Sequence, residues 1–365
     1  MGKIAKYVWV ILFIGVISGC SGFGGGANKT MSVKEIGSFH VGGRSATLAG
    51  LPTKEVRFTP TQPPVTIDPN GEFEVEQMYA QYTLVADKAK RSEYPIIMIH
   101  GGGLSGVTWE TKPDGKPGWQ MFFLRHGYDV YVADAVERGR ASWARYPEIF
   151  KSEPIFRTKK EAWELFRFGS SYTVGAQRVA YPELQFPVDH FDQFLKQGVP
   201  RWVTNDAPTQ TAYNALVEKV CPCVLMPHSQ GSTFAYNAAL KYPNLVKGVI
   251  GIEPSGALDP SKTDLSPLKN VPMLFVWGDK IRETPRWRGI VAPLQKMISA
   301  LKQQGGVADE IDLPQAGIVG NSHMIMMDRN SDQVAALVQK GFRFSISHPE
   351  GDEFRLSLPL QTIED

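Results

Sequence analysis

A chain of 365 residues with 42% hydrophobic residues is long enough for one large α/β domain that carries an insertion. Its 39 Lys and Arg side chains are nearly balanced by 37 Asp and Glu, so the formal net charge is only +2. This balance excludes a strong field that would attract nucleic acid, and no nucleic-acid partner is predicted.

The first 20 residues follow the plan of an export signal. Lys3 and Lys6 precede an apolar run over residues 7–17, and small residues then lead to a cysteine. The I-S-G-C sequence at 17–20 is similar to a bacterial lipobox, in which the cysteine becomes the lipidated first residue of the mature protein. A plain signal peptide or a single membrane anchor is the alternative, although the apolar run is short for a span of about 20 residues.

We therefore predict a lipoprotein signal peptide at residues 1–19 and a lipid anchor on Cys20. This anchor would hold the protein on a membrane, facing the periplasm or the cell exterior. Glycines are frequent in residues 20–30, which are predicted to form a flexible tether. Residues 31–365 are predicted to form the folded domain.

Two segments of alternating polarity, 38–47 and 72–85, predict antiparallel strands at the start of this domain. Short apolar runs bounded by turn residues follow at 94–99, 128–133, 224–226, 249–252 and 273–277. Helical spacing of apolar residues marks 232–241, 286–304 and 331–341. This alternation predicts an α/β fold with a mostly parallel central sheet flanked by helices. In such sheets the chemistry lies just after the carboxyl ends of the strands.

Directly after the run at 94–99 the chain reads His100-Gly101-Gly102-Gly103. Consecutive glycines let backbone N–H groups approach a ligand without obstruction by side chains. A His-Gly-Gly-Gly loop that follows a strand can supply a backbone N–H that stabilises an oxyanion. We predict that Gly102 and Gly103 serve as oxyanion donors, and that His100 braces the loop rather than acting as a base.

Segment 141–208 separates the strand that ends near Asp134 from the next apolar run. It is rich in aromatic residues, among them Trp143, Tyr146, Phe156, Trp163, Phe166, Phe168, Phe186, Phe191, Phe194 and Trp202. A loop of this length inside a compact domain is uncommon unless it is functional, so the segment is predicted to be a cap inserted over the site. The aromatics would suit an apolar or aromatic substrate, but packing of the cap alone explains them equally well.

Cys221 and Cys223 flank a proline just before the run at 224–226. They are predicted to be buried small side chains rather than a disulfide, because their separation is too short for easy loop closure. Export would nevertheless place them in an oxidising compartment. No Cys or His partner stands nearby at ligand spacing, so no metal site is predicted.

Residues 225–232 read L-M-P-H-S-Q-G-S, in which Ser229 follows a strand and precedes a helix. This is the context of the G-x-S-x-G nucleophile elbow, with Gly231 in the second glycine position and Pro227 in the first. The fixed φ of proline is compatible with the end of a strand. We predict Ser229 as the nucleophile and the backbone N–H of Gln230 as an oxyanion donor.

The catalytic histidine in such sheets lies C-terminal to the serine, after the last strand. His323 and His348 are the candidates. His323 lies in a turn between the probable strand at 310–313 and the helix at 331–341, whereas His348 lies in a polar tail. We predict His323 as the general base.

The acid has two candidates. The customary position follows the strand at 273–277 in a G-x-x-D pattern, and here Ile281 stands where the carboxylate belongs, while Asp279 comes too early. Glu253 follows the preceding strand, at 249–252, and a buried carboxylate there could orient the same imidazole. We predict Glu253, with Asp279 as the alternative.

These residues together resemble the α/β-hydrolase superfamily and, within it, the secreted bacterial esterases grouped as esterase-713-like. The resemblance covers nearly all of the mature chain. Its motifs are 37–44 (G-S-F-H-V-G-G-R), 100–106 (H-G-G-G-L-S-G), 108–110, 113–115, 117–119, 134, 138–140, 228–231 (H-S-Q-G), 253–254, 278–279 and 321–324 (N-S-H-M). It implies an acid from the strand before the customary one, in agreement with Glu253. Two departures are Pro227 in the elbow and glycines at oxyanion-loop positions where some relatives carry a cysteine pair.

The predicted function is that of an exported serine carboxylesterase acting on small-molecule or polymer esters through an acyl-enzyme, with no metal or organic cofactor. Its activity is expected to rise with pH through an apparent pKa near the ordinary histidine value of about 6.5. Two alternatives stay open: a catalytically silent surface lipoprotein that binds a ligand, and an amidase or peptidase with the same triad. The sequence leaves the oligomeric state undetermined.

Overall fold

The computed structural model describes residues 30–176 and 178–347. The predicted signal peptide at 1–19, Cys20, the tether up to residue 29 and His348 lie outside these residues. Within the described ranges, no helix combines the length and the apolar character that a membrane span requires.

An eight-stranded sheet has the strand order β1-β4-β6-β5-β7-β8-β9-β10. The β1–β4 and β4–β6 pairs are antiparallel, and all later neighbours are parallel. The strands are β1 (Val33–Leu48), β4 (Gly71–Val85), β5 (Ile96–Ile99), β6 (Val130–Asp134), β7 (Cys223–Pro227), β8 (Val246–Ile252), β9 (Met273–Trp277) and β10 (Ala308–Asp312). The predicted mostly parallel sheet with an antiparallel start is confirmed.

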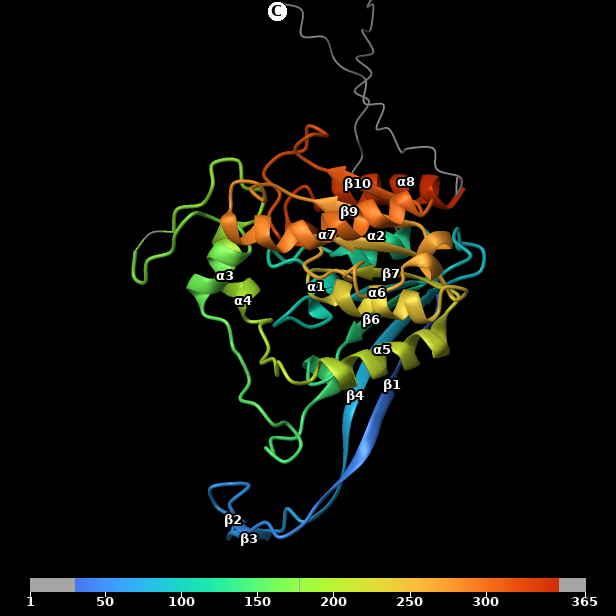
Figure 1. The fold of residues 1–365 in the computed structure, drawn as a ribbon. Helices are drawn as coiled ribbons and strands as arrows, with labels where there is room; N and C mark the ends of the chain where they lie inside the picture. The colour runs from blue at the N-terminus through green and yellow to red at the C-terminus, as the bar shows by residue number, and fades with distance from the viewer. Residues whose placement is uncertain (1–29, 177, 348–365) are drawn as a thin grey trace, which may run out of the picture. The chain divides into compact units, whose positions relative to one another are not determined.

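Helices cover both faces of this sheet (Figure 1). Helices α5 and α6 pack on one face together with α7, whereas α2 and α8 pack on the other. The helices are α1 (Val107–Glu110), α2 (Trp119–Arg125), α3 (Lys159–Leu165), α4 (Phe191–Leu195), α5 (Asp206–Val220), α6 (Gly231–Lys241), α7 (Pro285–Gln303) and α8 (Ser331–Ser347). Strands β5, β7 and β9 are buried along their whole length, as expected for parallel strands covered on both sides.

Strands β1 and β4 continue past the rest of the sheet as a two-stranded arm (Figure 1). Near the arm's far end β2 (Lys54–Val56) pairs with β3 (Val65–Ile67). The base of the arm packs against segment 141–208 in a small apolar cluster of Ala46, Leu48, Val75, Ile149, Phe150 and Trp202. Strand β1 begins at Val33, before the predicted strand at 38–47, because its first residues pair with the end of β4.

Segment 141–208 leaves the sheet after β6 and returns to it through α5. Its helices α3 and α4 are short, and a 3-10 turn at Val188–His190 precedes α4. Its fully buried aromatics include Trp163, Phe168, Phe186, Phe191 and Phe194. Because regular structure is sparse there, aromatic contacts hold much of the segment in place, for example the stacked rings of Phe168 and Phe186, whose centroids lie 4.0 Å apart.

The structure joins Cys221 and Cys223 in a disulfide, whereas their spacing favoured two buried, unpaired side chains and left their oxidation state undetermined. The chain turns at Pro222, between the end of α5 and the start of β7, and this turn brings the two Cα atoms to 4.3 Å. Sequence spacing alone did not reveal this turn geometry. The disulfide lies at the amino end of β7, opposite the end that carries Ser229.

Candidate active site

The turn between β7 and α6 carries Ser229 at the carboxyl edge of the sheet. Ser229 has a φ of +51°, a left-handed conformation that is uncommon for residues other than glycine. A strained strand–turn–helix elbow of this kind exposes a serine hydroxyl above the sheet. The N–H of Ser229 donates to the carbonyl of Ile252 at 3.1 Å, which ties the turn to the end of β8.

Pro227 occupies the first glycine position of the elbow without interrupting the sheet. It is the last residue of β7 and pairs in register with Ile99, whose carbonyl accepts the N–H of His228 at 2.8 Å. The second glycine position is more restricted, because a Cβ added to Gly231 would lie 2.6 Å from the carbonyl oxygen of His100. The elbow thus retains glycine at the position where close packing requires it.

Glu253 and His323 meet at the same edge, although 70 residues separate them in sequence. His323 Nδ1–H donates to Glu253 Oε2 at 3.1 Å, and both side chains are buried. This bond leaves the Nε2 atom of the imidazole as the proton acceptor. Glu253 itself follows β8 with a φ of +49°, so two of the candidate residues lie on left-handed turns at strand ends.

Asp279, the alternative acid, binds backbone instead of the imidazole. Its Oδ2 accepts the N–H of Asn321 at 3.0 Å, and its own N–H donates to the Asn321 carbonyl at 2.9 Å. These bonds hold the loop that carries His323 against the end of β9. The structure therefore brings Glu253, and not Asp279, into contact with the histidine.

Arg167 forms an ion pair with Glu253 in the interior. Its Nη2 donates to Glu253 Oε1 at 2.7 Å, and its Nε donates to the Asp279 carbonyl at 2.6 Å. The guanidinium also lies 4.4 Å from the ring centre of Trp287, a cation–π contact. Both charged side chains are at most 1% exposed, so solvent screens their attraction little.

Three groups fix the position of His323 besides Glu253. Its N–H donates to the Phe166 carbonyl at 3.0 Å, and its carbonyl accepts from His228 Nε2–H at 2.9 Å. The rings of Trp287 and Phe166 lie 4.4 Å and 5.5 Å from the imidazole centre. Aromatic faces therefore enclose the imidazole, and His228, which is adjacent to Ser229, holds the backbone carbonyl of His323.

These surroundings lower the pKa of His323 well below 6.5, chiefly through burial and further through the positive charges of Arg167 and Arg157. Burial raises the pKa of Glu253, and the Arg167 guanidinium opposes that rise by stabilising the carboxylate. A lowered histidine pKa keeps the imidazole neutral and able to accept a proton at neutral pH. The expectation of a pKa near 6.5 is corrected accordingly, because sequence does not reveal burial or the two arginines.

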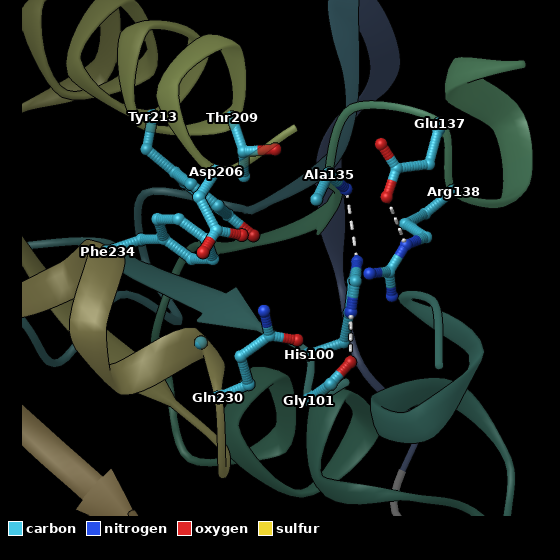
Figure 2. Close-up of a pocket in the computed structure, with 11 residues that line it drawn as sticks. His100, Gly101, Ala135, Glu137, Arg138, Asp206, Thr209, Tyr213, Gln230 and Phe234 are labelled. Atoms are coloured by element: carbon cyan, nitrogen blue, oxygen red, sulfur yellow. Dashed lines mark hydrogen bonds and ion pairs between the residues drawn. The ribbon is translucent and has the colours of Figure 1, made fainter. Parts of the chain in front are cut away.

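His100 braces the glycine loop, as the sequence predicted for this histidine. Its Nδ1–H donates to the Gly101 carbonyl at 2.9 Å, and its Nε2 accepts the N–H of Ala135 at 3.0 Å (Figure 2). Burial and the charge of Arg138 lower its pKa to about 4, so the ring is neutral at neutral pH. Both ring nitrogens are occupied by backbone partners, which leaves His100 no role as a base.

The predicted oxyanion donors lie close together. A Cβ added to Gly102 would lie 2.7 Å from the side-chain amide of Gln230, so the loop and the start of α6 are in contact. Gln230 is the N-cap of α6, where backbone N–H groups lack partners within the helix. Behind this contact lies a cavity of about 10 Å³, lined by His100, Gln230 and Arg138, with room for about one water molecule (Figure 2).

A larger cavity, of about 400 Å³, opens beside the loop and is within the size range of small-molecule sites. It begins at Gly103 and Leu104 and continues along segment 141–208. The segment contributes Phe156, Arg157, Ala162, Phe166, Phe194 and Val199 to its walls. Since Phe166 also stacks on His323, this cavity adjoins the candidate catalytic residues.

Sequence reasoning missed Phe166, Arg167, Trp287 and His228 as parts of this site. The one signal for Arg167 is its place inside an aromatic run, W-E-L-F-R-F at 163–168, where a lone cation needs a partner once buried. Neither the partner nor the burial is visible in the sequence. The hydrogen bond from His228 to the His323 carbonyl joins residues 95 positions apart, and the sequence does not reveal it.

Comparison with known proteins places this site in context. A family model described as putative esterase matches residues 164–308. A solved structure described as that of a novel bacterial esterase is 33% identical, covers 87% of this chain and 98% of its own, and superposes with a TM-score of 0.75. A probable secreted lipase, phiG, from Fungal sp. (strain ATCC 74256) is 27% identical over 336 residues, covering 73% of this chain and 87% of its own.

Proposed function

Because the chain belongs to the α/β-hydrolase esterase family of that bacterial enzyme, we propose that it is an exported serine carboxylesterase of the esterase-713-like group. The family assignment gives ester hydrolysis as the reaction. The proposal adds that Ser229 is the nucleophile, that Glu253 and His323 complete a triad with it, and that the protein is exported.

The observation that carries the proposal is the hydrogen-bonded pair of His323 and Glu253 at the sheet edge where Ser229 takes its left-handed turn. A serine, a buried carboxylate and a histidine, in this order along the chain of an α/β fold, are the components of an acyl-transfer triad. The Oγ of Ser229 lies 3.3 Å from the Oγ of Ser255. In the reacting complex the Ser229 hydroxyl would instead donate to His323 Nε2.

The proposed reaction runs in two halves. Ser229 Oγ attacks the ester carbonyl as its proton passes to His323 Nε2, while Glu253 stabilises the imidazolium through the Nδ1–H bond. Backbone N–H groups of Gln230, Gly102 and Gly103 stabilise the oxyanion. Collapse of this intermediate transfers the proton from Nε2 to the departing alkoxide, which leaves as the alcohol. A water molecule, deprotonated by the same imidazole, then attacks the acyl-enzyme. The imidazolium returns this proton to Ser229 Oγ as the acid is released.

Segment 141–208 acts as the cap over this site in the proposal. Its residues form most of the wall of the 400 Å³ cavity, and Phe166 and Arg167 contact the histidine and glutamate directly. Substrate would enter beside the oxyanion loop at Gly103. Closing one side of the site with aromatic side chains strengthens the electrostatic interactions inside it.

Export and lipidation on Cys20 complete the proposal. They rest on the lipobox at 17–20, and the name of the secreted fungal relative agrees with export. The disulfide between Cys221 and Cys223 fits an oxidising compartment. Palmitate incorporation into the wild-type chain but not into Cys20→Ser would test the anchor.

Hydrolysis of p-nitrophenyl esters from acetate to octanoate tests the function. The full chain in mild detergent is expected to release p-nitrophenol, and Ser229→Ala is expected to lower kcat by about 10⁴-fold or more. Ser255→Ala is the matched control, since that hydroxyl contacts Ser229 but has no assigned proton transfer. Faster cleavage of p-nitroanilides than of esters would favour the amidase alternative, and an inert wild-type chain would favour a binding protein.

A further inference from the structure

Arg157 brings a positive charge to the oxyanion loop. A Cβ added to Gly103 would lie 3.4 Å from Arg157 Nε, so the side chain lies beside the predicted oxyanion donor. Arg157 also lines the 400 Å³ cavity and is 24% exposed. The guanidinium therefore lies where the cavity meets the predicted oxyanion loop.

The hydrogen-bonding capacity of Arg157 is only partly used. Its Nη1 pairs with Glu161, one turn along α3. Its Nε, by contrast, is buried and has no hydrogen-bond partner among the described residues. A buried N–H of a charged group without an acceptor is costly, and a ligand oxygen could satisfy it.

Other cations surround this position. With the amide of Gln230 turned so that its oxygen faces Arg201, that oxygen accepts from Arg201 Nε at 3.1 Å. Burial lowers the pKa of Arg157, and the positive charges of Arg286 and Arg201 lower it further. The acid that pairs with Arg201 is Asp206, at 3.6 Å and largely exposed.

The acidic side chains near the cavity are already engaged. Asp192 lines it, but its Oδ1 binds both Lys159 at 2.7 Å and Arg178 at 2.6 Å. Glu161 is occupied by Arg157. Lys196 also lines the cavity and has no ion pair within the described residues. Cations thus outnumber acids around an otherwise apolar pocket.

We infer that the esterase takes esters that carry a free carboxylate, with Arg157 as the residue that binds it beside the oxyanion loop. This inference rests on the proposed function. The apolar walls formed by Leu104, Phe166 and Phe194 would hold the carbon chain between the scissile ester and the carboxylate. A bidentate guanidinium–carboxylate pair in such a partly desolvated pocket provides strong selectivity for charge.

The test compares esters that carry a free carboxylate with neutral esters of similar shape. On the acyl side, p-nitrophenyl hemiglutarate is compared with its methyl ester; on the alcohol side, 4-acetoxybenzoate is compared with methyl 4-acetoxybenzoate. The ratio of kcat/KM for the charged ester to that for the neutral ester is measured within each variant. Changes in overall activity or in the folded fraction therefore cancel. The pair with the higher ratio identifies which part of the substrate carries the carboxylate.

Wild type is expected to prefer the charged member of one pair. Arg157→Met should lower that ratio by about 10- to 100-fold, mainly by raising KM for the charged ester, and Arg157→Lys should keep part of it. Glu161→Gln should raise the ratio, because it removes the acid that competes for Arg157. Arg44→Met is the control, since Arg44 forms an exposed ion pair with Glu76 on the β1–β4 arm.

A wild-type ratio of one or less for both pairs, or equal ratios in wild type and Arg157→Met, would contradict the inference. Turnover of the neutral esters by wild type, abolished by Ser229→Ala, would in that case leave the proposed function standing. The preference should also shrink as NaCl is raised from low to high concentration, because salt screens a partly exposed ion pair.

Discussion

Ser229, Glu253 and the glycine loop each follow a strand of the sheet directly, whereas Phe166 and Arg167 reach the same site from a segment with little regular structure. The sheet edge holds the reacting groups, because parallel strands place their ends side by side. Segment 141–208 contributes burial, an aromatic face and positive charge. The sheet thus fixes the positions of the candidate catalytic residues, whereas segment 141–208 sets their electrostatic environment.

The largest effect at the sheet edge is expected from Glu253→Gln. An amide cannot hold the imidazolium or fix its tautomer as a carboxylate does, so kcat should fall by about 10⁴-fold. Asp279→Asn is the matched control, because Asp279 binds only backbone, and its kcat should stay within about tenfold of wild type. Ester hydrolysis at saturating substrate measures both. A larger loss in Asp279→Asn than in Glu253→Gln would assign the acid to Asp279.

Arg167→Met tests the contribution of segment 141–208. It leaves the Glu253 carboxylate buried without its cation, which should lower the free energy of unfolding by about 3 kcal/mol. The freed carboxylate should also shift the imidazole and lower kcat by about 10- to 100-fold. Denaturant unfolding and kcat measure the two effects. If Arg167→Met loses stability but keeps full kcat and an unchanged pH profile, Arg167 is structural only.

The pH dependence of kcat/KM tests whether charges from segment 141–208 act on His323. His323 must be neutral to accept a proton, and burial, Arg167 and Arg157 lower its pKa. The acid limb of kcat/KM is therefore expected below pH 6.5, with a flat region at neutral pH. Arg167→Met removes one of these cations and should move the limb to higher pH. A wild-type limb at or above pH 6.5 would contradict this description of the histidine.

The smallest effect is expected from Phe166→Leu. Leucine keeps an apolar wall in the cavity but loses the ring that stacks on His323. The loss should amount to a few-fold in kcat/KM, in keeping with the modest energy of one aromatic contact. Phe122→Leu serves as the control, because Phe122 stacks on His126, which lies just before the amino end of β6 and is no part of the candidate site. Equal effects of the two substitutions would show that stacking on the imidazole has no special role.

The sequence predicted most of the sheet and the candidate residues at its edge. Apolar runs marked the parallel strands, and Ser229, Glu253 and His323 could be named because each follows such a run or its connecting turn. Ile281 in the customary acid position directed attention to Glu253. The placement of these residues at one edge could be inferred because strand order in an α/β sheet determines which chain segments meet.

Features that depend on three-dimensional contact could not be predicted. Arg167 meets Glu253 across 86 residues of sequence, through a segment whose path follows aromatic packing rather than periodicity. The disulfide between Cys221 and Cys223 depends on one turn at Pro222. The lowered pKa of His323 depends on burial and on two arginines from that segment.

Covalent labelling tests the central claim, that Ser229 is the nucleophile of this site, most directly. Diethyl p-nitrophenyl phosphate would be added to wild type and to Ser229→Ala, followed by intact-mass measurement and peptide mapping. The account predicts one diethylphosphoryl group on wild type, located on Ser229, with loss of esterase activity in step with labelling and no label on Ser229→Ala. A label on another residue, or equal labelling of both proteins, would contradict it.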